Sequence, residues 1–432
     1  MLTSLFTDHY ELTMLQAALA SGAAHRPSVF EAFARRLPEG RRYGVVAGTG
    51  RLLEGLRDFH FDDESLRFLS DTKVVDKATI SYLENFRFSG TITGYAEGEL
   101  YFPNSPVLTV QSTFAEACVI ETYLLSILNH DSAIASAASR MIASASGRPC
   151  IEMGSRRTHE ESAVAAARAA VIAGFTSTSN LEAGSRYGLK TLGTSAHSFT
   201  LLHDTEADAF AAQVASLGRG TTLLVDTYDV ERGVRTAVEV AGPELGAVRL
   251  DSGDLVQQAT WVRELLDDLG NWNTKITVTS DLDEYAIAAL ASAPVDAYGV
   301  GTALVTGSGH PTASMVYKLV ARHDAQGNWV PVAKAATNKA SVGGRKRGFR
   351  QLNERGRAVT ELVTLNDADP QVDARALTVP LVVDGEIDTR YVGAEGVRLA
   401  AQRHHDSIQE LPGEARKLQR GEPVIPTEFL EN

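Results

Sequence analysis

Between residues 150 and 302 the sequence alternates short apolar runs with alanine-rich or amphipathic segments. The apolar runs are CIEM, GFTST, LKTLG, TTLLVD, AVRL, KITVT and VDAYGV. The segments between them include HEESAVAAARAAVIAG and DLVQQATWVRELLDDLG, which have helical periodicity. Strands that alternate with helices are typical of βα units around a parallel sheet. The pattern predicts an α/β fold with an irregular parallel barrel of about seven strands.

Each of these runs is followed by a short polar turn. The turns are SRRT, SN, TSAHS, DTYD, DSGD, SDLD and GVGT, in chain order. In a parallel α/β barrel the turns after the strands open at one mouth, where such barrels carry their chemistry. A doubly wound open sheet would also align turns at one edge, but it would gather fewer of them at its switch point. We therefore expect the seven turns to meet.

The flanking regions have a different texture, which predicts further domains. Residues 1–115 combine a helix in LFTDHYELTMLQAALASG, capped by Thr7 or Asp8, with glycine-punctuated β-structure. The stretch MVYKLVARHDAQGNWVPVAKAA resembles a hairpin that rejoins this first sheet. We expect an open-faced α+β domain over 1–115, joined by about 315–365. The catalytic barrel domain then covers 116–314, and a small C-terminal region covers 366–432.

Composition excludes several classes of protein. The formal net charge is −13, which disfavours a general surface for nucleic acid or anionic membranes. No apolar stretch approaches the roughly 20 residues that cross a bilayer, and the acidic N-terminal segment does not resemble a secretory signal. We expect a cytoplasmic protein. Cys118 and Cys150 have no CxxC or histidine spacing, so neither a disulfide scaffold nor a structural zinc site is expected.

Basic residues are nevertheless gathered in two places. Six of them lie between Lys334 and Arg350, and GSRR sets Arg156 beside Arg157. Such gathering in an acidic protein favours a site for a small anion, although a solvated basic loop explains the 334–350 run equally well.

The stretch RLDSGDL is the most specific of the turns. Arg249 ends a strand, Ser252 and Gly253 keep the backbone open, and a helix begins directly afterwards. Asp254 fits either the site or a simple helix N-cap. The Asp251 carboxylate has the chemistry to accept two neighbouring sugar hydroxyls, and the helix start offers N–H groups to a phosphate.

The turns after the next strands suggest a phosphate cradle. Gly299, Gly301 and Thr302 of GVGT would face the same mouth as Ser280 and Asp281 of SDLDE, although glycines after a strand often only form a tight turn. Small residues with free amides bind anions. A phosphate cradle, an aspartate, several arginines and a histidine at one mouth together suit a phosphorylated sugar. A pentose with a pyrophosphate at its anomeric carbon is the obvious candidate. The leaving pyrophosphate would be held by Mg²⁺ and basic groups.

His197, in GTSAHSF, has two readings. An isolated histidine is most often a side chain satisfied by a neighbouring carbonyl. The alternative is that it is one of the functional groups at the predicted mouth.

The ordered motifs resemble the nicotinate phosphoribosyltransferase family, a type II phosphoribosyltransferase family, over nearly the whole chain. TDHYELTM is similar to the family's TDLYELTM, with His9 in place of an apolar residue. FEAFARRLPEGRRYGVVAGTGRLLEGL, EMGSRRTH, TSTSNLEAG, GTSAHSF, RLDSGDL, SDLDE and YGVGT follow in family order. GTSAHSF with RLDSGDL is the most diagnostic pair.

The resemblance implies roles for single residues. His197, Asp251 and Arg249 would be catalytic, with ATP phosphorylating His197, which adds about −1.5 to −2 charges. Nicotinate would contact Tyr10, Met153, Arg249 and Ser179, and Tyr10 would reach into the neighbouring subunit of a homodimer. The donor and its phosphates would contact Arg156, Arg157, Asp251, Ser252, Gly253, Ser280, Asp281, Gly299, Gly301 and Thr302. Lys334, Lys339 and Lys346 would bind ATP or pyrophosphate, and Mg²⁺ would arrive on the substrates without a protein metal site.

Some positions depart from the family pattern. Met153 stands where relatives carry an aromatic residue, although a thioether also packs on an aromatic face. In VAKAATNKASVGGRKRGFR, Ala336 replaces an expected serine and Gly343 an expected proline, which makes the backbone of this loop less restricted.

The implied reaction is ATP-coupled transfer of phosphoribose from 5-phosphoribosyl 1-pyrophosphate to nicotinate. Its products are nicotinate mononucleotide and pyrophosphate, in NAD biosynthesis, and the enzyme class is a pentosyltransferase grouped with C–N ligases. Alternatives are a nicotinamide- or quinolinate-using enzyme and a non-catalytic sugar-phosphate sensor. TSTSNLEAG has no acidic residue before Glu182 that could accept a hydrogen bond from the amide N–H₂ of nicotinamide. This favours a pyridine base that carries a carboxylate.

Overall fold

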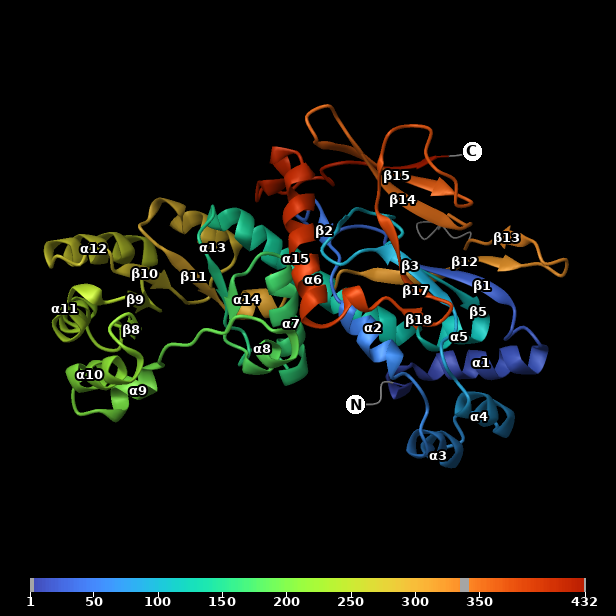
Figure 1. Ribbon diagram of the computed structural model, residues 1–432, viewed down its shortest axis with the longest axis horizontal. Helices are drawn as coiled ribbons and strands as arrows, with labels where there is room; N and C mark the ends of the chain where they lie inside the picture. Colours follow the sequence, from blue (N-terminus) through green and yellow to red (C-terminus); the bar gives the residue numbers. More distant parts are fainter. Residues whose placement is uncertain (1–3, 335–341, 431–432) are drawn as a thin grey trace. The chain divides into compact units, whose positions relative to one another are not determined.

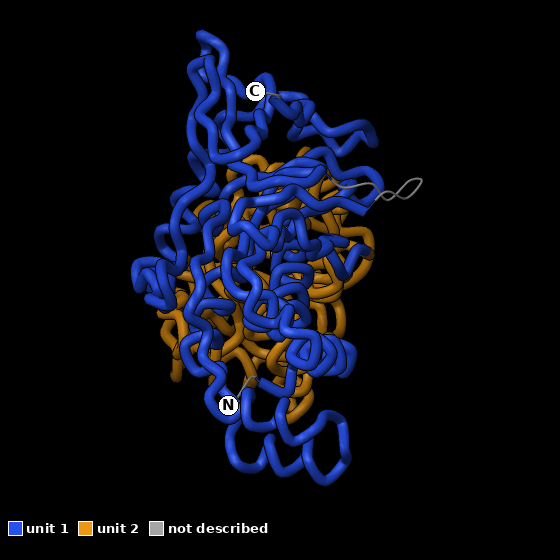
Figure 2. Tube along the Cα trace, turned by 90° about the vertical axis from the view of Figure 1, so that its right-hand side faces the viewer, with its two compact units in different colours: residues 1–136, 310–432 blue, residues 137–309 orange. Residues whose placement is uncertain are grey.

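The computed structural model describes residues 4–334 and 342–430. The chain divides into two compact units, residues 1–136 with 310–432 and residues 137–309 (Figure 2). Unit 1 denotes the first and unit 2 the second. In the described part of the chain, no helix has both the length and the apolar character needed to cross a membrane.

Unit 2 contains the predicted parallel sheet (Figure 1). Its strand order is β7-β6-β11-β10-β9-β8, and every neighbouring pair is parallel. The strands are β6 (Cys150–Glu152), β7 (Ser177–Thr178), β8 (Thr222–Leu224), β9 (Ala247–Leu250), β10 (Lys275–Val278) and β11 (Ala297–Val300). The parallel α/β prediction is confirmed.

The sheet is a curled half-barrel with β7 and β8 at its edges, and the strand count of a seven-stranded barrel is not confirmed. LKTLG, predicted as a full strand, contributes one isolated parallel bridge between Thr191 and Thr178. Residues 190–193 of this run are exposed and only Leu189 is buried, so little apolar burial holds this segment against the sheet edge.

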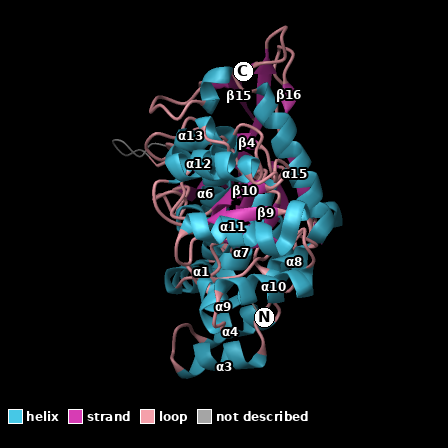
Figure 3. Cartoon of the chain, turned by 90° about the vertical axis from the view of Figure 1, so that its left-hand side faces the viewer, coloured by secondary structure: helices cyan, strands magenta, loops and turns pink. Residues whose placement is uncertain are grey.

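The helices of unit 2 begin in the polar turns. They are α7 (Glu160–Ile172), α8 (Leu181–Tyr187), α9 (His197–Leu202), α10 (Glu206–Leu217), α11 (Val230–Ala241), α12 (Leu255–Asp268), α13 (Glu284–Ala289) and α14 (Thr302–Val305). Asn180, Thr205, Asp229, Asp254 and Asp283 accept N–H bonds as N-caps. Of the two interpretations of Asp254, the structure shows the helix N-cap, at the start of α12. Figure 3 shows α11 and α12 beside the strands.

Unit 1 is built on a seven-stranded sheet with the order β13-β12-β1-β5-β3-β17-β18. The strands are β1 (Pro27–Ala34), β3 (Thr91–Tyr95), β5 (Leu108–Thr113), β12 (Met315–His323), β13 (Trp329–Pro331), β17 (Thr378–Val383) and β18 (Glu386–Ile387). β12 pairs with β1 and then turns into β13, so the hairpin does rejoin the first sheet as predicted. Phe30 and Ala32 of β1 face an apolar core that also holds Leu12 and Leu15 of the first helix.

The remaining elements of unit 1 complete two smaller sheets and a set of helices. One sheet has the order β16-β14-β15-β19, from β14 (Lys346–Leu352), β15 (Ala358–Leu365), β16 (Arg375–Ala376) and β19 (Thr427–Leu430); the other pairs β2 (Gly44–Val45) with β4 (Leu100–Tyr101). The helices are α1 (His9–Ser21), α2 (Thr49–Arg57), α3 (Asp63–Asp71), α4 (Lys77–Glu84), α5 (Phe114–Val119) and α15 (Gly393–Glu410); α6 (Glu121–Ala145) runs through residue 136, where the units divide. Asp8 caps α1 in a capping box with Glu11, as expected. The region 366–432 supplies β17 to the seven-stranded sheet.

Candidate active site

A cavity of about 350 Å³ opens at the carboxyl end of the unit 2 sheet. Turns after β6, β9, β10 and β11, together with the start of α9, line it. Five of the seven predicted turns therefore meet in one place. The lining residues are Met153, Arg156, Arg157, Ala196, His197, Arg249, Asp251, Thr279, Ser280, Asp281, Gly299, Gly301 and Thr302.

His197 lies at the start of α9 with its ring held from one side. Its Nε2 is 3.1 Å from Oδ1 of Asp226, while the side chain keeps 39% of its surface exposed. Because an ionised carboxylate only accepts hydrogen bonds, this contact assigns the ring proton to Nε2 and leaves the lone pair on Nδ1. The partner is a carboxylate, so the reading of His197 as a side chain satisfied by a carbonyl is wrong.

Asp226 was absent from the predicted site residues, although its turn, DTYD, was among the seven. The side chain is 1% exposed and lies two residues after the end of β8. Its Oδ2 accepts the backbone N–H of Asp251 at 2.8 Å and the hydroxyl of Ser252 at 2.9 Å. One buried carboxylate thus ties His197 to the DSGD turn. A carboxylate immediately after a strand, in a turn already expected at the mouth, was the available signal.

Arg249 is half-buried at the end of β9. Burial lowers the pKa of its guanidinium, and Arg156 adds to this, whereas the charges of Asp251 and Asp226 oppose it. Its Nη1 donates to the Thr194 hydroxyl, and its Nε is buried without a hydrogen-bond partner. A buried donor that lacks a partner favours an acceptor on a ligand.

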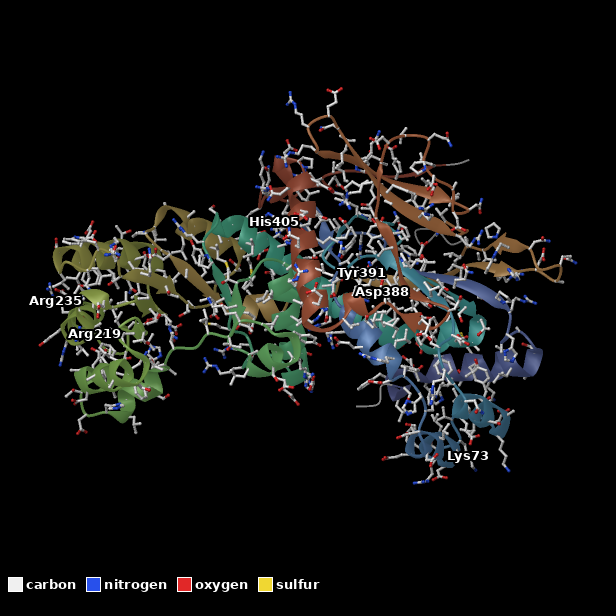
Figure 4. The ribbon with its side chains drawn as sticks, in the orientation of Figure 1. Lys73, Arg219, Arg235, Asp388, Tyr391 and His405 are labelled. Atoms are coloured by element: carbon white, nitrogen blue, oxygen red, sulfur yellow. The ribbon has the colours of Figure 1, made fainter. Side chains whose placement is uncertain are left out.

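Arg156 and Arg157 extend the cationic side of the cavity. Neither makes an ion pair with any residue that the structure describes. Two exposed arginines of unit 2 outside the cavity are paired: Arg219 lies 3.6 Å from Glu244 and Arg235 lies 2.8 Å from Glu231, near α11 (Figure 4). The two cavity arginines therefore keep their positive charge for a bound anion.

Asp251 brings a carboxylate to the same cavity. Its Oδ1 accepts the hydroxyl of Thr279, a residue absent from the predictions, and its Oδ2 has no hydrogen-bond partner among the described residues. Close packing shapes the floor: a Cβ on Gly299 would lie 2.7 Å from the Met153 sulfur and 2.5 Å from Thr279. Ser280 has a φ of 149°, in a region that favours glycine.

Other predicted residues lie outside this cavity. Ser179, Ser252 and Gly253 are exposed in neighbouring turns of unit 2 and do not line it. Tyr10 is on α1 of unit 1 and is 43% exposed.

The lysines proposed for ATP or pyrophosphate belong to unit 1. Lys334 is exposed, and Lys339, like Ala336, falls outside the described residues. Lys346 is buried with its ammonium 3.0 Å from Glu31, so its charge is already paired within unit 1. Arg345 and Arg347 of the same run pair with Asp367 and Asp369. This part of the basic run is therefore not a freely solvated loop.

No group of three or more histidine, cysteine or acidic residues suited to a metal ion occurs within residues 4–334 and 342–430. Asp251 and Asp281 are the carboxylates that line the cavity. Such oxygens fit an Mg²⁺ ion that arrives bound to substrate phosphates, which takes only one or two ligands from a protein.

Comparisons with known proteins show which family this chain is similar to. The family model described as nicotinate phosphoribosyltransferase (NAPRTase) N-terminal domain matches residues 5–129. Nicotinate phosphoribosyltransferase pncB1 of Mycobacterium tuberculosis is 56% identical over 99% of this chain and 95% of its own length. The Bacillus subtilis nicotinate phosphoribosyltransferase is 38% identical, over 81% of this chain and 74% of its own. The crystal structure of human nicotinic acid phosphoribosyltransferase has a TM-score of 0.84 at 25% identity, covering 98% of this chain and 97% of that one.

Proposed function

The chain belongs to the nicotinate phosphoribosyltransferase family, and from that premise we propose that it couples ATP cleavage to transfer of phosphoribose onto nicotinate. The donor is 5-phosphoribosyl 1-pyrophosphate and the products are nicotinate mononucleotide and pyrophosphate, in the salvage of nicotinate for NAD. The observation that carries this proposal is His197, held by Asp226 in the lining of a cavity whose arginines form no ion pair with any described residue.

In the transfer step the bond between C1 of the ribose and the pyrophosphate oxygen breaks, and its electron pair leaves with pyrophosphate. The lone pair of the pyridine nitrogen then forms the new bond to C1. Positive charge develops on the ribose ring, where the Asp251 carboxylate opposes it, and negative charge develops on the leaving group, where Arg156 and Arg157 oppose it. Asp251 and Asp281 would hold an Mg²⁺ ion that arrives on the donor, and such an ion would supply charge neutralisation to the pyrophosphate.

Arg249 is suited to the carboxylate of nicotinate. Its half-buried guanidinium has an unsatisfied Nε, and a carboxylate accepts two parallel N–H bonds from such a group. Ser280, Gly301 and Thr302 are assigned to the 5′-phosphate, because these small residues line the same cavity and their amides and hydroxyls can donate to an anion.

ATP is coupled to the reaction by phosphorylating His197. The Nδ1 lone pair attacks the γ-phosphorus, ADP leaves with the electrons of the broken bond, and Asp226 stabilises the imidazolium that forms. Hydrolysis of the phosphohistidine later releases phosphate and restores the ring. The added negative charge beside Arg249 and Asp251 gives the phosphorylated state a different affinity for the anionic donor.

The proposal includes a cytoplasmic homodimer in which Tyr10 of one copy stacks on the pyridine ring bound by the other. An exposed aromatic side chain at the start of α1 supports this. Mixing the inactive variants Tyr10→Ala and His197→Ala under exchange conditions should restore activity, since one site of each mixed dimer is intact. Failure of active mixed dimers to form would contradict a shared site.

The central experiment offers the protein nicotinate, nicotinamide or quinolinate with the donor, with and without ATP, and identifies products by mass spectrometry. We expect nicotinate mononucleotide, increased by ATP, and an acid-labile phosphorus signal on wild type but not on His197→Ala. His203→Ala is the matched control, because His203 ends the same helix with its Nδ1 on a backbone carbonyl. Turnover of another base, or equal phosphorylation of the His197 variant, would overturn the proposal.

A further inference from the structure

A buried carboxylate, Glu152, lies beneath the cavity without lining it. It ends β6 and is 0% exposed. One oxygen accepts the backbone N–H of Gly154 and the other accepts the Thr178 hydroxyl at the end of β7. Burial raises the pKa of this carboxyl, and the two hydrogen bonds oppose that rise. Both oxygens are thus engaged by the chain itself.

Thr178 extends the connection to the neighbouring turn. Its hydroxyl oxygen accepts the backbone N–H of Asn180 at 2.9 Å. The Asn180 side chain in turn donates to the Ser155 hydroxyl at 3.0 Å. The network therefore begins at Gly154, passes through β7, and returns to Ser155, so that it fixes the turn after β6 at two consecutive residues.

This turn carries both exposed cavity arginines. The N–H of Arg157 donates to the Gly154 carbonyl at 2.8 Å, which closes the turn over residues 154–157. Gly154 is also pressed against α14, since a Cβ there would lie 2.2 Å from the Val305 side chain. A shift at Gly154 would therefore move Arg156 and Arg157 together. Misplacement of positioned groups by about 1 Å is known to cost large factors in rate.

We propose that Glu152 is a positioning residue, which sets the place of the 154–157 turn and thereby of Arg156 and Arg157 for the pyrophosphate of the donor. The inference rests on the proposed function, because it assigns these arginines to that substrate. Glu152 touches no substrate. Its effect should appear in the affinity for the donor rather than in that for nicotinate, since Arg249 is held separately, by Thr194.

Two variants remove the network without removing volume. In Glu152→Gln the amide oxygen keeps Gly154, but the amide N–H₂ then meets Thr178, whose hydroxyl proton is left without an acceptor. In Thr178→Val the hydroxyl is lost and the shape is kept. Thr176→Val is the matched control: it removes a hydroxyl two residues earlier on the same segment, where it bonds the Cys150 carbonyl.

We expect the KM and the calorimetric Kd for 5-phosphoribosyl 1-pyrophosphate to rise about tenfold in Glu152→Gln and Thr178→Val. The KM for nicotinate should change little, and Thr176→Val should match wild type. In an Arg156→Ala/Arg157→Ala background, Glu152→Gln should add nothing, because its effect passes through those side chains. An additive effect there, or unchanged donor affinity in both single variants, overturns the inference. Absence of nicotinate turnover in wild type would instead overturn the proposed function.

Discussion

Arginines and carboxylates gather in two regions of this molecule, and they are arranged in opposite ways. In unit 1, Arg350 is fully buried with Glu99 and Glu361 each 2.7 Å away, and Arg375 reaches Glu99 at 2.8 Å and Glu410 at 2.7 Å. In the cavity of unit 2, Arg156, Arg157 and Arg249 form no ion pair among the described residues. We call the first group the buried charge cluster.

The pKa shifts of two arginines express this difference. Arg350 is the more deeply buried, yet Glu99 and Glu361 raise its pKa above the usual value despite the opposing effect of burial. Arg249 is less buried, yet burial lowers its pKa. The charges of Asp251 and Asp226 oppose this effect without offsetting it, since neither forms an ion pair with Arg249. The charge of Arg350 in unit 1 is thus stabilised by acidic residues of the chain itself, whereas the charge of Arg249 in unit 2 is left for a ligand. Pairing, not exposure alone, distinguishes a structural arginine from a binding one.

Arg350→Met tests the first half of the comparison and should have the largest effect. It leaves Glu99 and Glu361 buried without their shared cation, which costs about 3–5 kcal/mol of unfolding free energy. Urea unfolding, followed by fluorescence, measures the loss. Arg347→Met is the control on the same strand, since its pair with the exposed Asp369 is worth about 1 kcal/mol or less. Equal losses in the two variants would show that the cluster is not special.

The sequence predicts part of this contrast. RLDSGDL and SRRT place Arg249, Arg156 and Arg157 after strands, and the common direction of parallel strands is enough to bring them together. The place of Asp226 after a strand marks it as a residue of the mouth, but nothing in DTYD shows which of its two aspartates bonds a histidine and which caps a helix. In the structure Asp229 is the cap and Asp226 binds His197.

The buried charge cluster was beyond reach of sequence patterns. Arg350 lies in a basic run that read equally well as an anion site or a solvated loop, and its acids are Glu99, just before β4, and Glu361 in β15. Lys346 likewise meets Glu31 across 315 positions of the chain, from a different sheet. Such pairs depend on strand register and on how separate elements pack, which alternation of side chains constrains but does not specify.

Arg249→Met tests the second half of the comparison. We expect kcat/KM for nicotinate to fall roughly 100-fold, about 3 kcal/mol, because the base carboxylate loses its charged partner. The unfolding free energy should stay level or rise, since the change removes a half-buried cation with an unsatisfied Nε. Steady-state kinetics and urea unfolding of the same samples give both values. A matching loss of stability would make Arg249 structural and remove the contrast.

His404 sharpens the comparison through pH. It is buried on α15, near Glu99, and burial with the charge of His405 lowers its pKa from 6.5 to about 4 (Figure 4 labels His405). Because the unfolded chain then binds the extra proton, stability falls as the pH decreases from about 6.5 to about 4. His404→Gln should remove this dependence. Between pH 7 and pH 5 the variant should lose about 2 kcal/mol less unfolding free energy than wild type. His9→Gln, at an exposed histidine, controls for the substitution, and parallel pH curves for wild type and His404→Gln would contradict the prediction.

The smallest expected effect concerns backbone strain in the cavity. The other described non-glycine residues with positive φ lie between 48° and 65°, an ordinary left-handed region, whereas Ser280 lies at 149°. Such strain costs of order 1–3 kcal/mol and persists where the surroundings impose it, often at binding sites. Ser280→Gly should therefore stabilise the protein by about 1 kcal/mol after the entropic penalty of glycine. Ser280→Ala loses the same hydroxyl but keeps the strain, so it should not stabilise. If both variants unfold at the wild-type urea midpoint, the cavity stores no strain at Ser280, and its difference from unit 1 is one of charge pairing alone.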